Sequence, residues 1–542
     1  MKKITILLFT AAAMAAGCKK FTDINQNPNS PAVVTPNVVL SAALNGSASA
    51  LGTDFFNVNE WMGYWSRSGN YIAVQSTEQY ALTTGFADGD FQDQYSTMSK
   101  YNYIEQTALA NPVSQAFYAG VAKTMKALHF STLVDGFGNV PYSQAFQVLK
   151  YPTPAYDDAQ TIYNSLVTQL DSAVYYFNAA TTYYKTASST VIATDDKYDI
   201  MFGRGAGVAP ATRMAEWIKF ANTVKLKLLM TESQVASQSY IAGEIAKSVA
   251  SGGFLGANLS ASVNPGYGSA TQAQVNPFFG AFYTNSGSPT TTNNFYRANN
   301  YALNFYNGDH ADGSPNPTGT VDNTRPYYVY TYFSNGSIVG NYDGDPASIP
   351  NSGTSGIGNF SDKDGLTKTY SQDQLIMSDF ESLFLQAEAT ARGYNVGKAS
   401  GDALLQSAIE QNYIYLGDNQ ADADAYYASG SGDPNVSYTY ASSNPIDGSK
   451  VNADPTPGLQ AVMTQKWIAL NGINWMQAWT DFRRTQFPLS TVLSISHANA
   501  HVKNAIPYRF LYPASEFSTN GKNVPSLANA QYTPIFWDKF EK

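Results

Sequence analysis

Apolar residues recur at three- and four-residue spacing over much of this chain, and this period restricts the fold more than any other feature. Less regular patterns of the same period cover about 94–110, 113–133 and 238–250. Each such stripe is typical of the buried face of a surface helix. The two most regular stripes run through Ile162, Leu166, Leu170, Val174 and Phe177, and through Met214, Trp217, Ile218, Ala221, Val224 and Leu228.

The helical pattern resumes near Ser371, where Ile376, Phe380 and Leu383 share one face. Further helices are expected at about 401–415 and 457–479. Successive amphipathic helices with short connections pack as stacked pairs. No sequence repeat of fixed period is present, so any repeat is structural. The sequence therefore predicts a mainly α protein, with its helical scaffold at about 37–250 and 371–479.

Two loop-rich stretches, about 251–370 and 417–455, interrupt this scaffold. Gly, Asn, Ser, Thr, Pro and Tyr dominate the first, and no apolar period persists in it. Long irregular segments inside a folded protein are usually either functional or disordered. The many aromatic residues of the first stretch favour ordered loops. We therefore expect ordered loops in the first stretch and a further loop-rich insertion in the second.

The N-terminus has the order of a secretory signal: basic Lys2 and Lys3, an apolar run, then small residues directly before Cys18. Because Cys18 is the single cysteine among 542 residues, it has no partner for an internal disulfide. We interpret residues 1–17 as a signal peptide and Cys18 as the acylated residue of a lipoprotein. Residues 18–36, rich in Asn and Pro, predict an extended tether. The alternative is an ordinary cleaved signal with an incidental buried cysteine.

The composition of the mature chain argues for a neutral ligand. After Cys18 no apolar stretch has the length of a membrane span. A net charge of −9 argues against nucleic acid, which requires a basic footprint. Only 13% of the residues are charged, against about 25% in typical soluble proteins, whereas tyrosine occurs 38 times. Such a surface suits hydroxyl-rich ligands better than ionic ones.

The sequence contains no recognisable catalytic motif. His497 and His501 are four residues apart, but they lack the carboxylate of a zinc-hydrolase helix, and we read them as surface histidines. A pair of carboxylates for glycoside hydrolysis is defined by its separation in space, and no local pattern singles one pair out. We therefore expect no catalytic residues, no metal centre and no cofactor.

Five aspartates are candidate ligands for a structural calcium ion. Calcium binds through oxygen atoms, and acidic residues at short spacing supply them, although no complete 12-residue calcium loop is present. The candidates are Asp418, Asp422 and Asp424, or Asp343 and Asp345.

The strongest local signal is aromatic and lies between residues 60 and 71. A flat ring covers the apolar face of a pyranose while neighbouring polar groups bond its hydroxyls, a common pocket chemistry. Alternatively, Trp61 and Trp65, four residues apart, form the core stripe of a helix. The predicted ligand-binding residues are Trp61, Tyr64, Trp65, Arg67, Tyr71 and Tyr296.

Six segments, in the expected order from residue 18 to the C-terminus, resemble the SusD/RagB family of nutrient-binding outer-membrane lipoproteins. The lipidated start reads CKKFTDINQNPN, a turn between helices reads VDGFGNVPYSQAF, and a later helix reads EWIKFANTVKLK. The segments are 18–29, 134–157, 216–227, 381–389, 465–484 and 506–523.

The resemblance implies a single SusD-like domain over 37–542, built on tetratricopeptide-like helical pairs with an irregular ligand face. It also implies an outward-facing position on the outer membrane, a SusC-like TonB-dependent transporter as partner, and ligand capture without catalysis. Arg483, Arg484 and Arg509 are expected to pair with buried acids such as Glu381 or Glu388, as scaffold.

The resulting interpretation is a lipid-anchored protein that captures a glycan, or another oligomeric nutrient, for import. A surface glycan-degrading enzyme, a peptide-binding protein with the same import role and a structural adhesin are the alternatives that the sequence leaves open.

Overall fold

The computed structural model describes residues 34–540, except 74, 204, 206, 309–318, 359, 361–363, 398–399, 450, 490–492 and 497–504. Cys18, most of the expected tether and the pair His497 and His501 therefore lie outside the described residues. Within the described part no helix is both long and apolar enough to cross a membrane.

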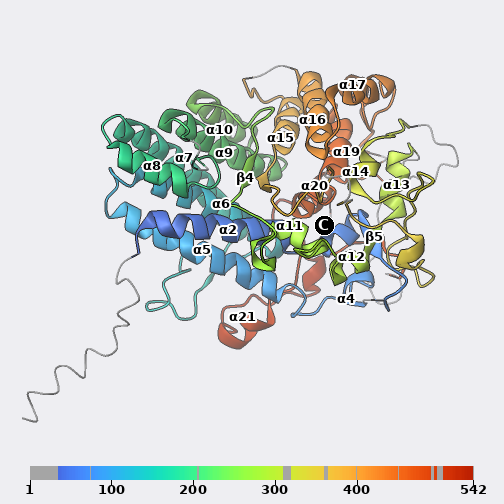
Figure 1. Cartoon of the computed structure of the whole chain (residues 1–542), viewed down its shortest axis with the longest axis horizontal. Helices are drawn as coiled ribbons and strands as arrows, with labels where there is room; N and C mark the ends of the chain where they lie inside the picture. Colours follow the sequence, from blue (N-terminus) through green and yellow to red (C-terminus); the bar gives the residue numbers. More distant parts are fainter. Residues whose placement is uncertain are drawn as a thin grey trace, which may run out of the picture.

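The N-terminal half is a layer of long helices in which each packs on the next. α2 lies against α5, α5 against α6, α6 against α7 and α7 against α9 (Figure 1, left half). This arrangement confirms the mainly helical fold predicted from the apolar stripes. The helices are α2 (Pro36–Thr53), α5 (Asp88–Leu109), α6 (Ala116–Phe137), α7 (Ala159–Tyr184), α8 (Ser189–Tyr198), α9 (Pro210–Thr231) and α10 (Gln238–Ser251).

Local sequence fixes where several of these helices begin. Asp158 accepts a hydrogen bond from the Thr161 amide at 2.9 Å and so caps α7, and Ser237 caps α10 in the same way. Proline occupies the first turn of α2 and α9, where its missing N–H costs nothing. α2 thus starts at Pro36, the last residue of the expected tether.

The C-terminal half contains β6 (Gln374–Met377), α15 (Asp379–Ala391), α16 (Gly401–Leu416), α19 (Leu459–Ala469) and α20 (Trp475–Thr485). Two boundaries differ from the prediction. The helix expected from Ser371 begins only after β6, which pairs with β4 (Ala261–Val263). The helix expected at 457–479 is two helices, because the chain turns at Gly472 with φ of 69°.

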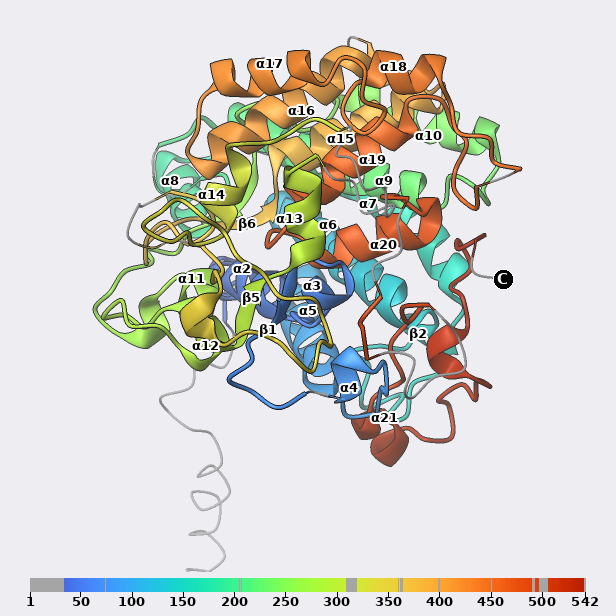
Figure 2. The ribbon, with the colours of Figure 1, turned by 90° about the vertical axis from the view of Figure 1, so that its right-hand side faces the viewer.

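The stretch 417–455 is less irregular than predicted, since it contains α17 (Gln420–Ser429) and α18 (Tyr438–Ser443). Their polar sequences show little apolar periodicity, so these helices were not expected. They are stabilised by packing against neighbouring helices. α17 packs on α16 and α18 on α19, as Figure 2 shows at the top of the molecule.

The described part of the stretch 251–370 contains short helices and strands, in agreement with the ordered loops expected from its aromatic content. β5 (Tyr296–Ala298) pairs antiparallel with β1 (Trp65–Arg67), and in the view of Figure 2 both lie between α12 and α13. The short helices of this stretch are α11 (Pro277–Phe282), α12 (Thr291–Phe295), α13 (Asn300–Tyr306) and α14 (Arg325–Val329).

Other short elements lie outside this stretch. The strands β2 (Val140–Pro141) and β3 (Tyr156–Asp157) pair with each other. The short helices are α3 (Val58–Trp61), α4 (Gln75–Glu78) and α21 (Ala514–Thr519).

A buried network of ion pairs joins the two halves. Arg484 on α20 binds both carboxylate oxygens of Glu388 on α15, with Nη2–Oε2 at 2.6 Å, and Nη2 lies 2.5 Å from Asp481 Oδ1. Its Nη1 also donates to the Met230 carbonyl of α9 at 3.2 Å. Lys466 on α19 lies 2.8 Å from the other oxygen of Asp481. The expectation that Arg484 pairs with Glu388 is confirmed.

The other two arginines of that expectation behave differently. Arg483 stacks on the Trp479 ring at 3.6 Å and donates to the carbonyls of Tyr508 and Asp135, not to a carboxylate. Arg509 lies over the Tyr512 ring at 5.0 Å. No ion pair of either arginine with an acid is present among the described residues.

Replacing Arg484 by methionine should lower the free energy of unfolding by about 3–5 kcal/mol, because Glu388 and Asp481 stay buried with one cation fewer. Urea unfolding measures the change. Lys247→Met is the matched control: its exposed ammonium pairs with Glu244 at the surface, so its loss should cost at most about 1 kcal/mol. Equal effects of the two substitutions would contradict a structural role for the network.

Candidate ligand-binding face

The surface beside β1 and β5 is held together by one arginine. Arg67 ends β1 and is 4% exposed. Its Nε donates to Glu78 Oε1 at 2.7 Å, Nη1 to the Tyr71 carbonyl at 2.5 Å, and Nη2 to the Asp345 carbonyl at 3.3 Å. A planar guanidinium with several donors suits such bridging of separate segments. Arg67 thus fixes the loop after β1 against the segment around residue 345.

Backbone and amide bonds complete this junction. Asn341 Nδ2 donates to the carbonyls of Arg67 and Ile349, at 3.1 and 3.0 Å. The Gly69 amide donates to the Ile349 carbonyl at 3.0 Å, and the Asn351 amide to Asn70 Oδ1 at 2.8 Å. Segments nearly 300 positions apart in the chain therefore form one surface. We call residues 68–72 and 327–351 the candidate face.

Most of the predicted ligand-binding residues lie under this face rather than on it. Trp61, Tyr64 and Trp65 are fully buried. Trp61 stacks on Phe86 with centroids 5.7 Å apart, and Tyr64 Oη donates to the Trp467 carbonyl at 2.5 Å. Both tryptophans belong to the core, as the alternative interpretation holds, but they do not share a helix, because Trp61 ends α3 and Trp65 begins β1.

The remaining three predicted residues are also largely occupied by the protein. Tyr296 is 7% exposed and packs on Trp65 with centroids 5.1 Å apart, and Arg67 is the bridge described above. Tyr71 is half-buried, with its ring edge-on to Phe295 at 5.2 Å. Of the six, Tyr71 alone lies on the candidate face with part of its side chain accessible.

The exposed rings of the candidate face come from residues that sequence reasoning did not select as ligand-binding. Tyr327, Tyr332 and Tyr342 are 38%, 44% and 44% exposed, and the first two are in edge-to-face contact at 5.5 Å. Isolated β-bridges tie this region to β5, since Arg297 pairs with Gly356 and Asn299 with Asn341. Their signal in the sequence was the tyrosine-rich composition of the stretch, which does not say which rings are exposed.

A cluster of acids is buried beneath the face. Glu60, Glu78 and Asp343 are each at most 4% exposed, and Arg67 is the cation among them. Neither carboxylate oxygen of Asp343 has a hydrogen-bond partner among the described residues. Burial, with the charge of Glu78 added, raises the pKa of Asp343 to about 8, and Arg67 offsets only part of this. Burial and Asp343 likewise raise the pKa of Glu60 well above its usual value.

The calcium candidates do not form a cation site among the described residues, where no three acidic, histidine or cysteine side chains are grouped to hold a metal. Asp343 belongs to the buried cluster, whereas Asp345 binds Arg67 through its carbonyl. Asp418 and Asp422 both accept from Asn419, and Asp424 accepts from Gln406 at 3.0 Å.

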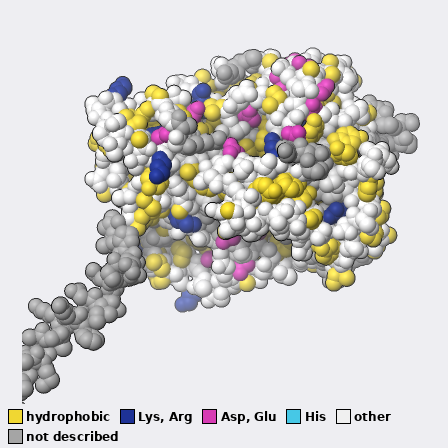
Figure 3. Space-filling model, viewed as in Figure 1, with side chains coloured by type: hydrophobic (Ala, Val, Ile, Leu, Met, Phe, Trp, Pro, Cys, Tyr) yellow, Lys and Arg dark blue, Asp and Glu magenta, His cyan; other side chains and the backbone are white. Residues whose placement is uncertain are grey.

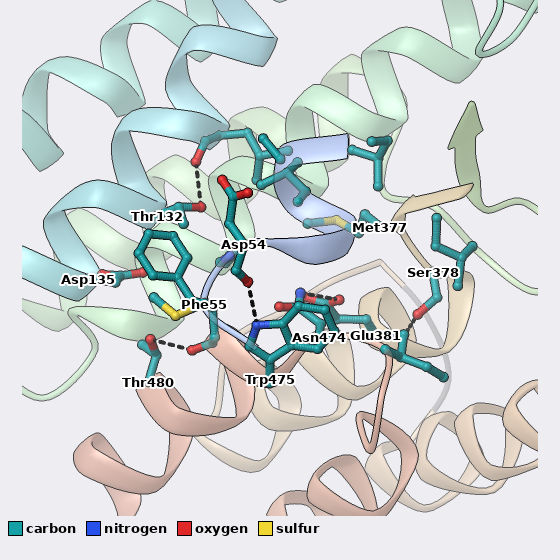
Figure 4. A pocket seen from close by; sticks show the side chains of 18 of the residues that line it. Asp54, Phe55, Thr132, Asp135, Met377, Ser378, Glu381, Asn474, Trp475 and Thr480 are labelled. Carbon is teal, nitrogen blue, oxygen red and sulfur yellow. Dashed lines mark hydrogen bonds between the residues drawn. The ribbon is translucent and has the colours of Figure 1, made fainter. Parts of the chain in front are cut away.

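A second group of buried acids lines the interior cavity drawn in Figure 4. Asp54, which directly follows α2, lines it together with Asp135 of α6 and Glu381 of α15, and Lys227 lies in its wall. Its volume of about 40 Å³ holds a few water molecules, whereas ligand pockets measure about 300–1,000 Å³. Burial, with Asp90 nearby, raises the pKa of Asp54 to about 8. A sugar does not fit here, so these carboxylates are not a glycosidase pair.

The family of the chain follows from comparison with known proteins. The sequence profile of a SusD-like family, described as starch-binding and associating with the outer membrane, matches residues 28–513. The chain belongs to this SusD-like family. Among curated proteins, none matches the sequence. The resemblance carried by the six sequence segments is thereby confirmed.

Solved structures of SusD-like proteins share the fold. One from Bacteroides thetaiotaomicron has a TM-score of 0.67 at 20% identity, covering 93% of this chain and 98% of that one. A chitin-binding SusD homologue from Flavobacterium johnsoniae has a TM-score of 0.68 at 19% identity, covering 92% and 98%. A SusD homologue from Bacteroides vulgatus has a TM-score of 0.68 at 16% identity, covering 92% and 97%.

Replacing Asp343 by asparagine should flatten the pH dependence of stability. The folded state holds a proton on Asp343 that the unfolded chain releases near pH 4. The stability this gives is therefore complete below about pH 4 and is lost as pH rises through about 8. Asparagine mimics the protonated acid at every pH, so urea unfolding at pH 5 and pH 8 should differ less in the variant. Part of the pH dependence of stability should persist in the variant, because other titratable groups remain beside position 343: Glu60, Glu78, Arg67 and Tyr80.

Asp158→Asn is the control for this measurement, because asparagine caps a helix as well as aspartate does and the side chain is exposed. An unchanged difference between pH 5 and pH 8 in Asp343→Asn would show that Asp343 is ionised in the fold.

Proposed function

We propose that the protein is a cell-surface lipoprotein that binds a glycan and passes it to a SusC-like TonB-dependent transporter. The observation that carries the proposal is the match of residues 28–513 to a family described as starch-binding and associating with the outer membrane. A structural relative from Flavobacterium johnsoniae is a chitin-binding protein. Starch and chitin are both neutral polymers of pyranose rings, and such a ligand suits the surface of this chain.

The candidate face has the chemistry that neutral glycans require. Tyr327, Tyr332 and Tyr342 offer ring faces with one polar handle each. Figure 3 shows a surface on which uncharged atoms predominate and charged side chains are scattered. Binding there depends on stacking and on hydrogen bonds to hydroxyls, and charge contributes little. The bonds from Arg67 and Asn341 hold the loops in place before the ligand arrives, which lowers the cost of ordering them.

The anchor in this proposal is Cys18, acylated after removal of residues 1–17. Several acyl chains on one cysteine attach a protein stably to a membrane, where a single chain attaches it only marginally. Residues 18–36 then act as the tether between the lipid and α2. The outward position and the transporter partner are what the family resemblance implies.

Catalysis is not part of the proposal. The acids under the candidate face are buried, and the cavity lined by Asp54, Asp135 and Glu381 measures about 40 Å³, which is too small for a sugar ring. A surface glycan-degrading enzyme would release new reducing ends from a glycan mixture, whereas the proposed protein binds the same glycans and leaves them intact.

Removing exposed rings should weaken glycan binding without unfolding the protein. Each of Tyr332→Ala and Tyr342→Ala is expected to cost about 1–2 kcal/mol of binding free energy, or about five- to thirty-fold in Kd for starch or chitin oligosaccharides. Isothermal titration calorimetry measures this. Tyr175→Ala is the matched control, because Tyr175 is 68% exposed on α7, away from the candidate face. Unchanged affinity in both face variants would place the glycan elsewhere, and saturable peptide binding without glycan binding would favour the peptide alternative.

The import role predicts a stable complex in the outer membrane. The tagged protein, expressed in its native host and solubilised gently, should bring down a large TonB-dependent barrel in stoichiometric amount. Cys18→Ala should leave the protein unlipidated and out of the membrane fraction. Recovery of the lipoprotein alone, under conditions that preserve other barrel complexes, would contradict the transporter partnership and favour the adhesin or the enzyme.

A further inference from the structure

A large groove opens on the helical layer, away from the candidate face. It measures about 590 Å³ and lies among α5, α6, α7 and the segment that follows β2. These helices occupy the left half of Figure 1, whereas α12, α13 and α14 lie in the right half. None of the residues that line the groove belongs to the candidate face. Its volume is within the range of small-ligand sites.

The floor of the groove carries an excess of positive charge. Lys123 Nζ lies 2.8 Å from Glu105 Oε1 and donates to Gln169 Oε1 at 2.6 Å. Lys126 Nζ lies 2.9 Å from Glu105 Oε2 and donates to Asn102 Oδ1 at 3.1 Å. Two ammonium groups thus share one carboxylate. Although burial favours its neutral form, the two lysines hold the pKa of Glu105 below its usual value, so it is ionised and the trio has a net charge of +1.

Each ammonium group also keeps bonding capacity. A lysine ammonium has three N–H donors, and in the described part of the chain two of them are directed at protein oxygens on each of Lys123 and Lys126. One donor on each remains for a ligand. Because both lysines bind the same carboxylate, Glu105, their ammonium groups lie on the same part of the groove floor.

Aromatic rings lie beside the lysines in the groove. Phe130, Tyr142 and Phe146 line it, with Phe130 and Tyr142 edge-to-face at 4.8 Å. Tyr142 and Phe146 are half-buried, so each leaves ring surface open. Lys126 Nζ lies 5.5 Å from the centre of the Phe146 ring, which places charge and ring side by side. Amide and hydroxyl groups of Gln106, Ser143, Gln147 and Gln169 complete the rim.

The geometry points to a second ligand site in this groove, for a sugar that bears a carboxylate, such as a uronic acid at the end of a short oligosaccharide. The carboxylate meets the two free ammonium donors, where it balances the net positive charge. The apolar face of the ring packs on Phe146 and Tyr142, and the amides of the rim bond the hydroxyls. A positive charge alone would bind any anion, and rings alone would bind any sugar. Because Lys126 and Phe146 lie side by side, the groove favours a sugar that carries a carboxylate. The assignment is independent of the glycan proposed for the candidate face.

The test is calorimetric titration of the unlipidated full-length mature chain with di- and tri-galacturonic acid, against galactose oligomers of the same length. Saturable binding is expected for the acidic oligomers and at least tenfold weaker binding for the neutral ones. Raising the salt concentration should weaken the former, since the contact is ionic. No saturable binding of the acidic oligomers, or equal binding of both, would overturn the assignment.

Variants locate the site. Lys126→Gln should weaken binding of the acidic oligomers at least tenfold, while Lys247→Gln, which removes an exposed lysine on α10, should change nothing. Gln147→Trp keeps the lysines and fills the exposed rim, so it should abolish binding even if Lys126→Gln fails to fold. Tyr332→Ala and Tyr342→Ala should leave acidic binding intact, which separates this site from the candidate face. Full binding by both groove variants would place the acid elsewhere and refute the site.

Discussion

The relative position of the two halves of the molecule depends on the buried ion pairs of Arg484. Its guanidinium contacts α9 through the Met230 carbonyl, α15 through Glu388 and its own helix through Asp481. Arg392 pairs with the same Glu388 and with Asp454, so three cations, Lys466 included, face three acids. Buried ions are costly unless they are paired and bonded, which means that the helices hold one relative position. The N-terminal helical layer and the C-terminal helices are thereby aligned.

That alignment is what supports the candidate face. Trp475 on α20 donates to the Asp54 carbonyl at 2.8 Å, and Trp467 on α19 donates to the Met62 carbonyl at 3.1 Å. Together with the bond from Tyr64 to the Trp467 carbonyl, these contacts fix α3 and the start of β1 from below. The aromatic segment that stands out in the sequence is therefore the foundation of the face. Its rings are buried in the core, and this packing supports the loops of the candidate face.

The long helices could be predicted well from the sequence, because the apolar period that marks a helix is a local pattern. α7 and α9 follow stripes that are visible in the chain, and caps such as Asp158 mark their starts. The break at Gly472 and the strand β6 were missed for different reasons. A positive φ is a property of one turn, and β6 pairs with residues more than 100 positions away. Exposure of individual tyrosines is equally non-local, so the composition indicated tyrosine-rich loops but did not show which rings are exposed.

Burial of arginine adds to the scarcity of charge at the surface of a chain in which only 13% of the residues are charged. Seven arginines of the described part are buried, where they bridge segments, as Arg67 does, or stack on rings, as Arg483 does. Arg67 and Arg484 are paired with carboxylates inside the fold, so their charges contribute little field outside it. Stacking and hydrogen bonding are then left to dominate the candidate face. The lysines of the α5–α7 groove depart from this pattern, because their shared partner Glu105 balances only one of two positive charges. A local positive excess on a surface with few charged side chains is a selective feature, since an anionic ligand finds few competing sites around it.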